Sequence, residues 1–205
     1  MGFYSDYILP GLLDKAMRQP DVLKLRRKLV PQARGNVLEI GIGSGVNLPL
    51  YSRDVTAVHG IEPSKGLRHK AEEEARGCDV PLNLVDAIAE DLPFDNQSFD
   101  TVISTWTMCT IPGLEQAFEE IRRVIKPDGQ LLFVEHGKSP DTGVHRWQNR
   151  INPVWKCVGG GCHLNRAIDE RVEAGGFAID GLETGYLARG PRWATWMYMG
   201  KARLR

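Results

Sequence analysis

The sequence predicts an α/β fold in which a mostly parallel, doubly wound sheet of seven strands is covered by helices. Three observations support this fold class: short apolar runs alternate with helical segments, a glycine-rich turn follows the first run, and two further runs lie close together near the C-terminus. Such alternation is typical of parallel strands connected by helices on both faces of a sheet. Because a loop containing Gly and Pro joins the last two runs, we expect an antiparallel C-terminal hairpin at one edge.

Residues 5–30 carry apolar side chains at helical spacing, and prolines divide them into one or two amphipathic helices. Further helices are expected over 64–76, 114–125 and 166–174, each ending near a glycine or proline. Apolar and β-branched runs predict strands over 36–40, 55–61, 82–85, 99–104, 130–135, 177–182 and 195–199. Residues 137–165 form a long insertion before the last helix.

The 205 residues are expected to form one domain, with residues 1–35 as an N-terminal helical cap. Lys and Arg number 26, as do Asp and Glu, so the net charge is zero. This balance disfavours a nucleic-acid-binding protein, because such proteins are usually basic. No apolar run reaches about 18 residues, so no membrane-spanning helix is expected. The N-terminus lacks the pattern of a signal peptide and the four cysteines are irregularly spaced, which predicts a cytoplasmic protein without a disulfide framework.

A glycine-rich turn, Gly41-Ile-Gly43-Ser-Gly45, directly follows the first strand. Glycines allow a sharp turn and the close approach of a ligand, and ligands of open α/β sheets bind at the carboxyl ends of the strands. Glu62 ends the second strand, where a carboxylate can accept hydrogen bonds from ribose hydroxyls. The turn has neither the dinucleotide pattern GxGxxG nor the phosphate-binding pattern GxxxxGK[ST]. The turn and the acid together predict a nucleoside-binding site.

Four segments resemble, in order, the motifs of the class I S-adenosylmethionine-dependent methyltransferases: VLEIGIGSG (37–45), IEPS (61–64), AEDLPFDNQSFDTVIS (89–104) and RRVIKPDGQLLFVEHG (122–137). Within this class the sequence resembles the methyltransferase type 11 group. More narrowly, it resembles small bacterial relatives of the methyltransferase-like thiol S-methyltransferases, through NLPLY (47–51), VEHG (134–137) and NPVWKCVGGGCHLNR (152–166). A weaker similarity links it to phospholipid N-methyltransferases and quinone C-methyltransferases. The resemblance implies a Rossmann-like sheet, S-adenosylmethionine as methyl donor and S-adenosylhomocysteine as product.

The resemblance also implies which residues contact the cofactor. They are Gly41, Gly43 and Gly45 along its methionine and ribose, Glu39 beside them, Glu62 on the ribose hydroxyls, Ala89 and Glu90 around the adenine through backbone groups, and Ser104 under the sulfonium, together with Asn47 and Pro63 of the same motifs. Many relatives carry Asp just before the adenine-side Ala, whereas this chain has Ile88. We therefore expect Ile88 to pack against the adenine ring in place of a side-chain hydrogen bond.

Methyl transfer from a sulfonium is an in-line displacement, in which the protein aligns the nucleophile and excludes water. A thiol acceptor ionises easily, whereas a phenol or alcohol needs more help from a base. The candidates for that base are His136, which follows the fifth strand, and His163 in the insertion, because imidazole titrates near neutral pH. The alternative for each is a purely structural hydrogen bond.

The acceptor is expected to contact Tyr4, Cys109 and Trp155, although Cys109 could instead be a small core residue. Residues 137–165 are interpreted as an acceptor-side insertion that covers the pocket. The N-terminal helix, with Phe3, Tyr4 and Tyr7, is expected to close the cofactor side.

A metal is not expected, because Cys157, Cys162 and His163 lack a fourth ligand and are poorly spaced for a closed zinc site. The function predicted is methyl transfer from S-adenosylmethionine to a small-molecule acceptor, preferably a thiol or another apolar nucleophile. The alternatives are a phosphatidylethanolamine N-methyltransferase, a quinone C- or O-methyltransferase and, more remotely, a non-catalytic nucleoside-binding module. The predicted partners include no nucleic acid; a monomer or homodimer is expected, with a possible peripheral membrane contact through the basic N-terminal helix.

Overall fold

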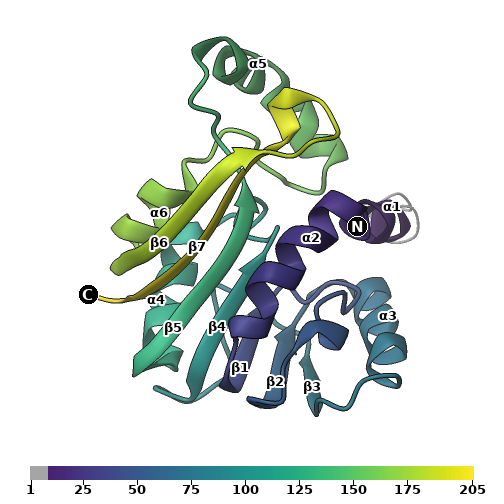
Figure 1. Ribbon diagram of the computed structural model, residues 1–205, viewed down its shortest axis with the longest axis vertical. Coiled ribbons are helices and arrows are strands. Elements are labelled where there is room, and N and C mark those ends of the chain that lie inside the picture. The colour runs from purple at the N-terminus through teal and green to yellow at the C-terminus, as the bar shows by residue number, and fades with distance from the viewer. Residues whose placement is uncertain (1–8) are drawn as a thin grey trace.

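A single seven-stranded sheet forms the centre of the computed structural model, which describes residues 9–205 (Figure 1). The strand order is β3-β2-β1-β4-β5-β7-β6. The strands are β1 (Gly35–Ile40), β2 (Val55–Ile61), β3 (Leu82–Val85), β4 (Phe99–Thr105), β5 (Ile125–His136), β6 (Phe177–Tyr186) and β7 (Trp196–Leu204). Strands β1 to β5 pair in parallel, and β7 pairs antiparallel with both β5 and β6. The predicted fold class and the C-terminal hairpin are therefore confirmed.

The last two strands are longer than the sequence analysis predicted. Strand β6 continues to Tyr186, and β7 continues to Leu204 instead of ending at Met199. The extension follows from alternation: Ala202 is buried, whereas Lys201 and Arg203 on either side of it are exposed. Because β7 has a neighbour on both sides, these residues also form main-chain hydrogen bonds.

Two hydrophobic cores lie on the two faces of the sheet, because neighbouring strand residues point to opposite faces. Leu131 and Phe133 of β5 belong to one core, and Leu132 and Val134 belong to the other. Helices α4 (Leu114–Val124) and α6 (Ile168–Ala174) cover the first face, and α2 (Pro20–Leu29) and α3 (Lys65–Ala75) cover the second. The sheet is therefore doubly wound, and its ligand-binding edge lies at the carboxyl ends of β1, β2, β4 and β5.

Two helices precede the sheet, α1 (Leu9–Met17) and α2, and Pro20 occupies the first turn of α2. Helix α1 packs against the glycine-rich turn and α3: Ser44 donates a hydrogen bond to Asp14 (2.5 Å), and Arg18 forms an ion pair with Glu74 (2.7 Å). The residues Phe3, Tyr4 and Tyr7, which were predicted to close the cofactor side, lie outside the described residues.

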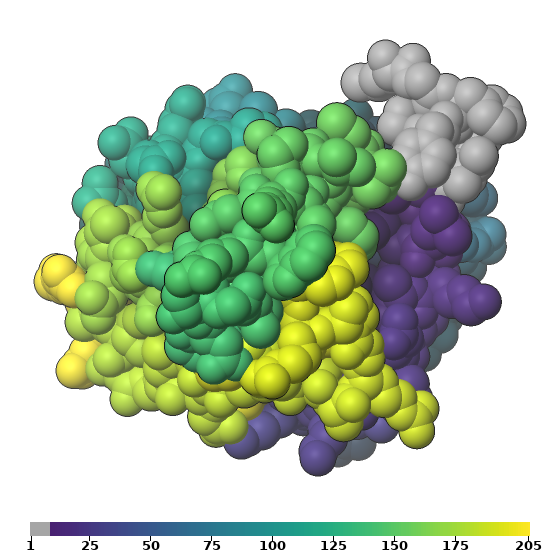
Figure 2. Space-filling model, turned by 90° about the horizontal axis from the view of Figure 1, so that it is seen from above, coloured from purple at the N-terminus to yellow at the C-terminus, as the bar shows by residue number. Residues whose placement is uncertain are grey.

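The insertion at 137–165 contains a helix that the sequence analysis did not assign, α5 (Thr142–Val158), with Pro153 inside it. It lies beyond the carboxyl ends of β4 and β5, beside the loop between β6 and β7 (Figures 1 and 2). Trp155 of α5 stacks edge-on against Trp193 of that loop, with ring centroids 5.2 Å apart. Within residues 9–205, no helix is both long and apolar enough to cross a bilayer.

Candidate functional site

The glycine-rich turn between β1 and the short 3-10 helix Leu48–Leu50 has an open floor, meaning one position where the backbone faces unfilled space. Gly41, Gly43 and Gly45 all have left-handed backbone conformations, with φ of +64°, +58° and +77°. A Cβ atom at Gly41 would overlap the Thr107 side chain, and one at Gly45 would lie 2.9 Å from Leu48. At Gly43 the nearest atom to such a Cβ would be the Gly41 carbonyl oxygen, 3.9 Å away. Close packing therefore leaves no room for a side chain at Gly41 or Gly45, whereas Gly43 borders space that a ligand can fill.

The carboxylate of Glu62 lies beside this turn, at the end of β2. One oxygen accepts a hydrogen bond from the Gly43 N–H (3.2 Å) and the other accepts one from the Ser64 N–H (2.9 Å). Burial raises the pKa of Glu62, against the opposing effect of these backbone hydrogen bonds. Each oxygen keeps a further lone pair, so the carboxylate can accept hydrogen bonds from two vicinal hydroxyls. The neighbouring Pro63 is exposed. An open floor next to this carboxylate fits the nucleoside part of S-adenosylmethionine.

The segment after β3 forms the next part of this edge. Ala89 is buried, whereas Ile88 is 50% exposed. The Glu90 side chain turns toward α4, where it accepts a hydrogen bond from the Gly113 N–H (3.0 Å). The Glu90 carbonyl accepts another from Gln116 (3.0 Å). The Glu90 carbonyl therefore already has a hydrogen-bond partner. Ile88, beside it, exposes an apolar side chain to solvent.

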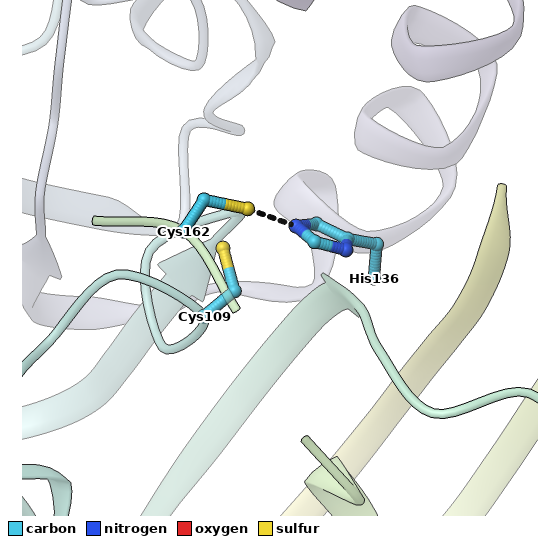
Figure 3. A group of neighbouring side chains, drawn as sticks. All are labelled: Cys109, His136 and Cys162. Atoms are coloured by element: carbon cyan, nitrogen blue, oxygen red, sulfur yellow. Dashed lines mark hydrogen bonds between the residues drawn. The ribbon is translucent and has the colours of Figure 1, made fainter. Parts of the chain in front are cut away.

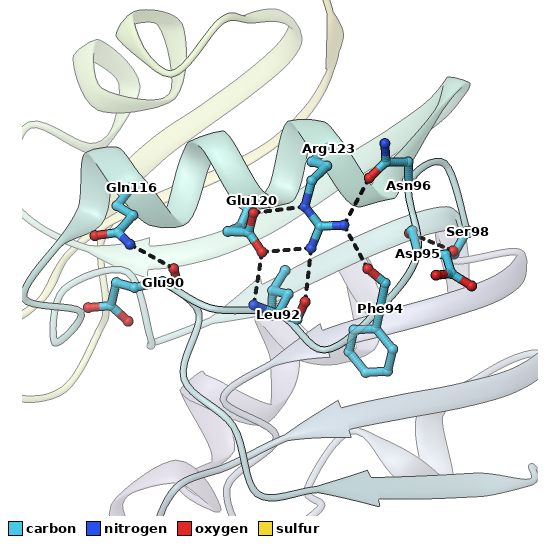
Figure 4. A network of polar contacts seen from close by, with 9 residues as sticks. All are labelled: Glu90, Leu92, Phe94, Asp95, Asn96, Ser98, Gln116, Glu120 and Arg123. Carbon is cyan, nitrogen blue, oxygen red and sulfur yellow. Dashed lines mark hydrogen bonds and ion pairs between the residues drawn. The ribbon is translucent and has the colours of Figure 1, made fainter.

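Arg123 of α4 anchors the chain that follows Glu90 (Figure 4). Its guanidinium donates to the carbonyls of Leu92 (2.9 Å) and Phe94 (2.6 Å) and forms an ion pair with Glu120 (2.7 Å). Glu120 in turn accepts a hydrogen bond from the Leu92 N–H (2.9 Å). This segment is thus attached to α4, which fixes the position of Ile88 and Ala89 upstream of it.

A buried polar network lies beneath the glycine-rich turn. Arg26 of α2 donates hydrogen bonds to Asn47 and to Thr105, each at 2.7 Å. Asn47 donates to Glu39 at the end of β1 (2.7 Å), and Tyr51 donates to the second Glu39 oxygen (2.7 Å). Asn47 and Glu39 were predicted to contact the cofactor. In the structure, both side chains form hydrogen bonds within this buried network.

Burial raises the pKa of Glu39 to about 7 and lowers that of Arg26 to about 10, although the two charges favour each other. The guanidinium also stacks over the Trp106 ring, 4.8 Å from its centroid. The sequence analysis missed Arg26. A signal was present, because Arg26 lies between Val22 and Leu29 on the apolar face of α2.

Ser104, predicted to lie under the sulfonium, is fully buried at the end of β4. Its hydroxyl donates to Glu135 of β5 (2.9 Å), and the same carboxylate oxygen accepts the N–H groups of Thr107 (2.9 Å) and Met108 (3.1 Å). Burial raises the pKa of Glu135. These three hydrogen bonds fix the turn after β4, whose Thr107 also contacts the glycine-rich turn through the Gly41 carbonyl (3.4 Å).

Three side chains gather next to this turn: Cys109 after β4, His136 at the end of β5 and Cys162 after α5 (Figure 3). A 3.0 Å hydrogen bond joins His136 Nε2 to Cys162 Sγ, and Trp155 Nε1 donates to the same sulfur (3.2 Å). Hydrogen bonding with Cys109 and the charge of His136 lower the pKa of Cys162. Burial alone would lower the pKa of His136. The charge and hydrogen bond of Cys162 and the charge of Glu135 outweigh burial, so the pKa of His136 is raised. The structure thus brings together His136, Cys109 and Trp155, which were predicted separately.

His163 does not belong to this cluster. Its backbone N–H donates to the Cys109 carbonyl (2.8 Å), and no hydrogen bond to its ring occurs among residues 9–205. Burial and the nearby Arg166 and Lys156 lower the pKa of the ring, which keeps it neutral at neutral pH. Cys157 is exposed on α5 and bonds the Pro153 carbonyl. Tyr4 lies outside the described residues.

Known proteins resemble this chain in both sequence and fold. A family model described as a methyltransferase domain (type 11) matches residues 38–133. Thiol S-methyltransferase TMT1B of Rattus norvegicus is 31% identical over 192 residues, covering 88% of this chain and 78% of that protein. Phosphatidylethanolamine N-methyltransferase of Cereibacter sphaeroides is 36% identical over 145 residues, covering 68% of each. The crystal structure of a methyltransferase from Thermotoga maritima has a TM-score of 0.67 at 20% identity, covering 99% of this chain and 96% of that one.

Proposed function

This chain belongs to the methyltransferase type 11 family and is an S-adenosylmethionine-dependent methyltransferase, and on that premise we propose that its methyl acceptor is a small, apolar thiol. The observation that carries the proposal is the chemistry of the acceptor side, where aromatic rings and sulfur atoms meet. Trp155 and Trp193 stack there, and Trp155 points its N–H at Cys162. The rat thiol S-methyltransferase, similar over 88% of this chain, also supports a thiol.

The cofactor, when bound, supplies an electrophilic methyl group on a sulfonium sulfur. We propose that Gly43 gives it room, that Glu62 accepts hydrogen bonds from its ribose hydroxyls and that Ile88 packs on its adenine. Helix α1 lies over the glycine-rich turn through the Ser44–Asp14 hydrogen bond and limits water there. A thiol has a pKa of about 8.5 and is partly ionised at neutral pH. The main task of these residues is therefore to align the acceptor with the methyl group.

The second candidate acceptor is the amine of a phospholipid. The bacterial phosphatidylethanolamine N-methyltransferase favours it, as does an apolar surface on α5. Trp147 is 59% exposed, Val154 is 69% exposed and Val158 is 49% exposed. Side chains seven and eleven positions apart share one face of a helix, so α5 could lie on a lipid surface through these three.

The test is a product analysis with purified protein, S-adenosylmethionine and four acceptors: an aryl thiol, phosphatidylethanolamine vesicles, a demethylquinone and a catechol. We expect mass spectrometry to find methylation of the thiol. Gly43→Arg, which fills the open floor of the turn, should abolish the product and exclude a contaminating enzyme. Gly143→Ala on the open surface of α5 is the matched control and should leave product formation unchanged. Methylation of the lipid or the quinone instead of the thiol would overturn the thiol proposal.

A further inference from the structure

The cluster of Cys109, His136 and Cys162 has the composition and the spacing of a metal site. Each residue offers one ligand atom, and the three atoms lie within 4.8 Å of one another, with His136 Nε2 and Cys162 Sγ 3.0 Å apart. Tetrahedral zinc binds sulfur at about 2.3 Å and imidazole nitrogen at about 2.0 Å, so its ligand atoms lie roughly 3.5–3.8 Å apart. The His136–Cys162 separation is shorter than this value and the 4.8 Å limit on the other pairs exceeds it, so side-chain shifts on the order of an ångström or less would close the site.

We propose that Cys109, His136 and Cys162 bind one thiophilic divalent cation, with Zn²⁺ as the expected metal, and leave its fourth position open to a small ligand. Thiolate and imidazole ligands select zinc over magnesium or calcium, which prefer oxygen. A site with three protein ligands and one open position is typical of catalytic zinc, whereas structural zinc has four protein ligands. His136 then serves as a ligand in place of the general base predicted from the sequence.

The backbone around Cys162 holds this arrangement independently of any metal. Gly160 and Gly161, with φ of +64° and +88°, turn the chain sharply after α5. The His163 N–H then donates to the carbonyl of Cys109 (2.8 Å), which joins the two cysteine segments next to each other. Trp155 holds the Cys162 sulfur from the α5 side. The ligands are therefore preorganised by main-chain contacts between segments far apart in the sequence.

The cluster is buried beside the glycine-rich turn. Cys109 is 2% exposed, and Cys162 and His136 are each 8% exposed. It also lies close to the glycine-rich turn: Thr107, which contacts Gly41, is two residues before Cys109, and it donates its N–H to Glu135, the residue before His136. Resting on the proposed function, the further step is that the acceptor thiol is the fourth ligand. It replaces a bound water as a thiolate and releases its proton to solvent.

The metal site is tested by titrating reduced, chelator-treated protein with Co²⁺, whose bonds to thiolates give a charge-transfer absorption band. We expect one equivalent per chain. Cys109→Ser and Cys162→Ser should each weaken the band and lower the affinity on the order of 100-fold. Cys157→Ser, at an exposed position outside the cluster, is the matched control and should behave as the unmodified protein. Circular dichroism checks that each variant is folded. Absence of the band at equimolar Co²⁺, or a band in both cluster variants as strong as that of the unmodified protein, would overturn the proposal.

The acceptor step has its own readout. Adding an aryl thiol to the Co²⁺-loaded protein should change the visible d–d spectrum as the fourth ligand changes. An unchanged spectrum would overturn this step and leave the metal site standing. A normal Co²⁺ band in a protein that methylates only lipid or quinone would instead overturn the thiol function, so the two failures are distinguishable.

Discussion

The proposed cofactor half and the proposed acceptor half of the site are built in different ways. In the cofactor half, Gly41 to Gly45 and Glu62 come from two consecutive strand ends, and backbone N–H groups hold the carboxylate in place. In the acceptor half, Cys109, His136 and Cys162 are side chains from three distant segments. The first half therefore depends on a short piece of chain with special backbone angles. The second depends on how α5 and its following loop fold back onto the sheet.

The cofactor half rests on one buried residue, Arg26, whose removal has the largest expected effect. Arg26 binds Asn47 behind the glycine-rich turn and Thr105 at the end of β4, and it is 4% exposed. Arg26→Ala would leave these groups and the Glu39 charge without their buried partner, so we expect the free energy of unfolding to fall by about 4 kcal/mol. Urea unfolding measures this loss. The adjacent Arg27 is exposed, and Arg27→Ala should change stability by less than about 0.5 kcal/mol. Equal effects of the two substitutions would show that this buried network does not stabilise the fold.

The cofactor half can be disabled separately through Gly43. Gly43→Arg places a long side chain in the open floor of the turn and strains a residue with φ of +58°. We expect the affinity for S-adenosylmethionine to fall at least about 100-fold, or roughly 3 kcal/mol, by isothermal titration calorimetry. Co²⁺ binding to the sulfur cluster should remain. If Gly43→Arg abolished Co²⁺ binding as well in a folded protein, the two halves would not be independent.

The same contrast explains what the sequence could predict. Local sequence patterns encode the strands, the order in which helices follow them, and the glycine-rich turn with Glu62. The fold class could therefore be predicted from these patterns. Helix α5 was not, because its pattern is inverted: Trp147 and Val154 are exposed, whereas Gln148 is fully buried and bonds the carbonyls of Gly137 and Trp193. A hydrophobic-periodicity argument cannot recognise such a helix.

The sulfur cluster was missed for a related reason. Cys162 was considered with its sequence neighbours Cys157 and His163, but the fold pairs it with Cys109 and His136 from other strand ends. Only the topology of β4 and β5, together with the glycines after α5, brings these residues together. Rules based on the sequence spacing of metal ligands apply to ligands that lie on one turn or hairpin. They cannot identify ligands that the fold brings together from three separate segments.

Glu39, in the network beneath the glycine-rich turn, makes the stability of the protein depend on pH. Burial raises its pKa from 4.5 to about 7, so between these values the folded state holds more protons than the unfolded state. Stability therefore falls as pH rises through this window. Between pH 5 and 8, the unmodified protein should lose about 2 kcal/mol relative to Glu39→Gln, whose side chain stays neutral. Urea unfolding of both proteins at the two pH values measures the difference. A pH-independent difference would contradict the raised pKa.

Ile88 carries the smallest expected effect and tests the departure from the family pattern. This side chain is 50% exposed beside the buried Ala89, and its predicted role is to cover the adenine ring. Burying its remaining apolar surface under a ligand would contribute about 1 kcal/mol, so Ile88→Ala should weaken S-adenosylmethionine binding about fivefold while leaving unfolding unchanged. Leu182 on β6 is a matched control, since it is also partly exposed, and Leu182→Ala should not alter the affinity. Equal affinity of Ile88→Ala and the unmodified protein in calorimetry would mean that backbone groups alone recognise the adenine, and the cofactor half would then depend on main-chain geometry from the methionine end to the base.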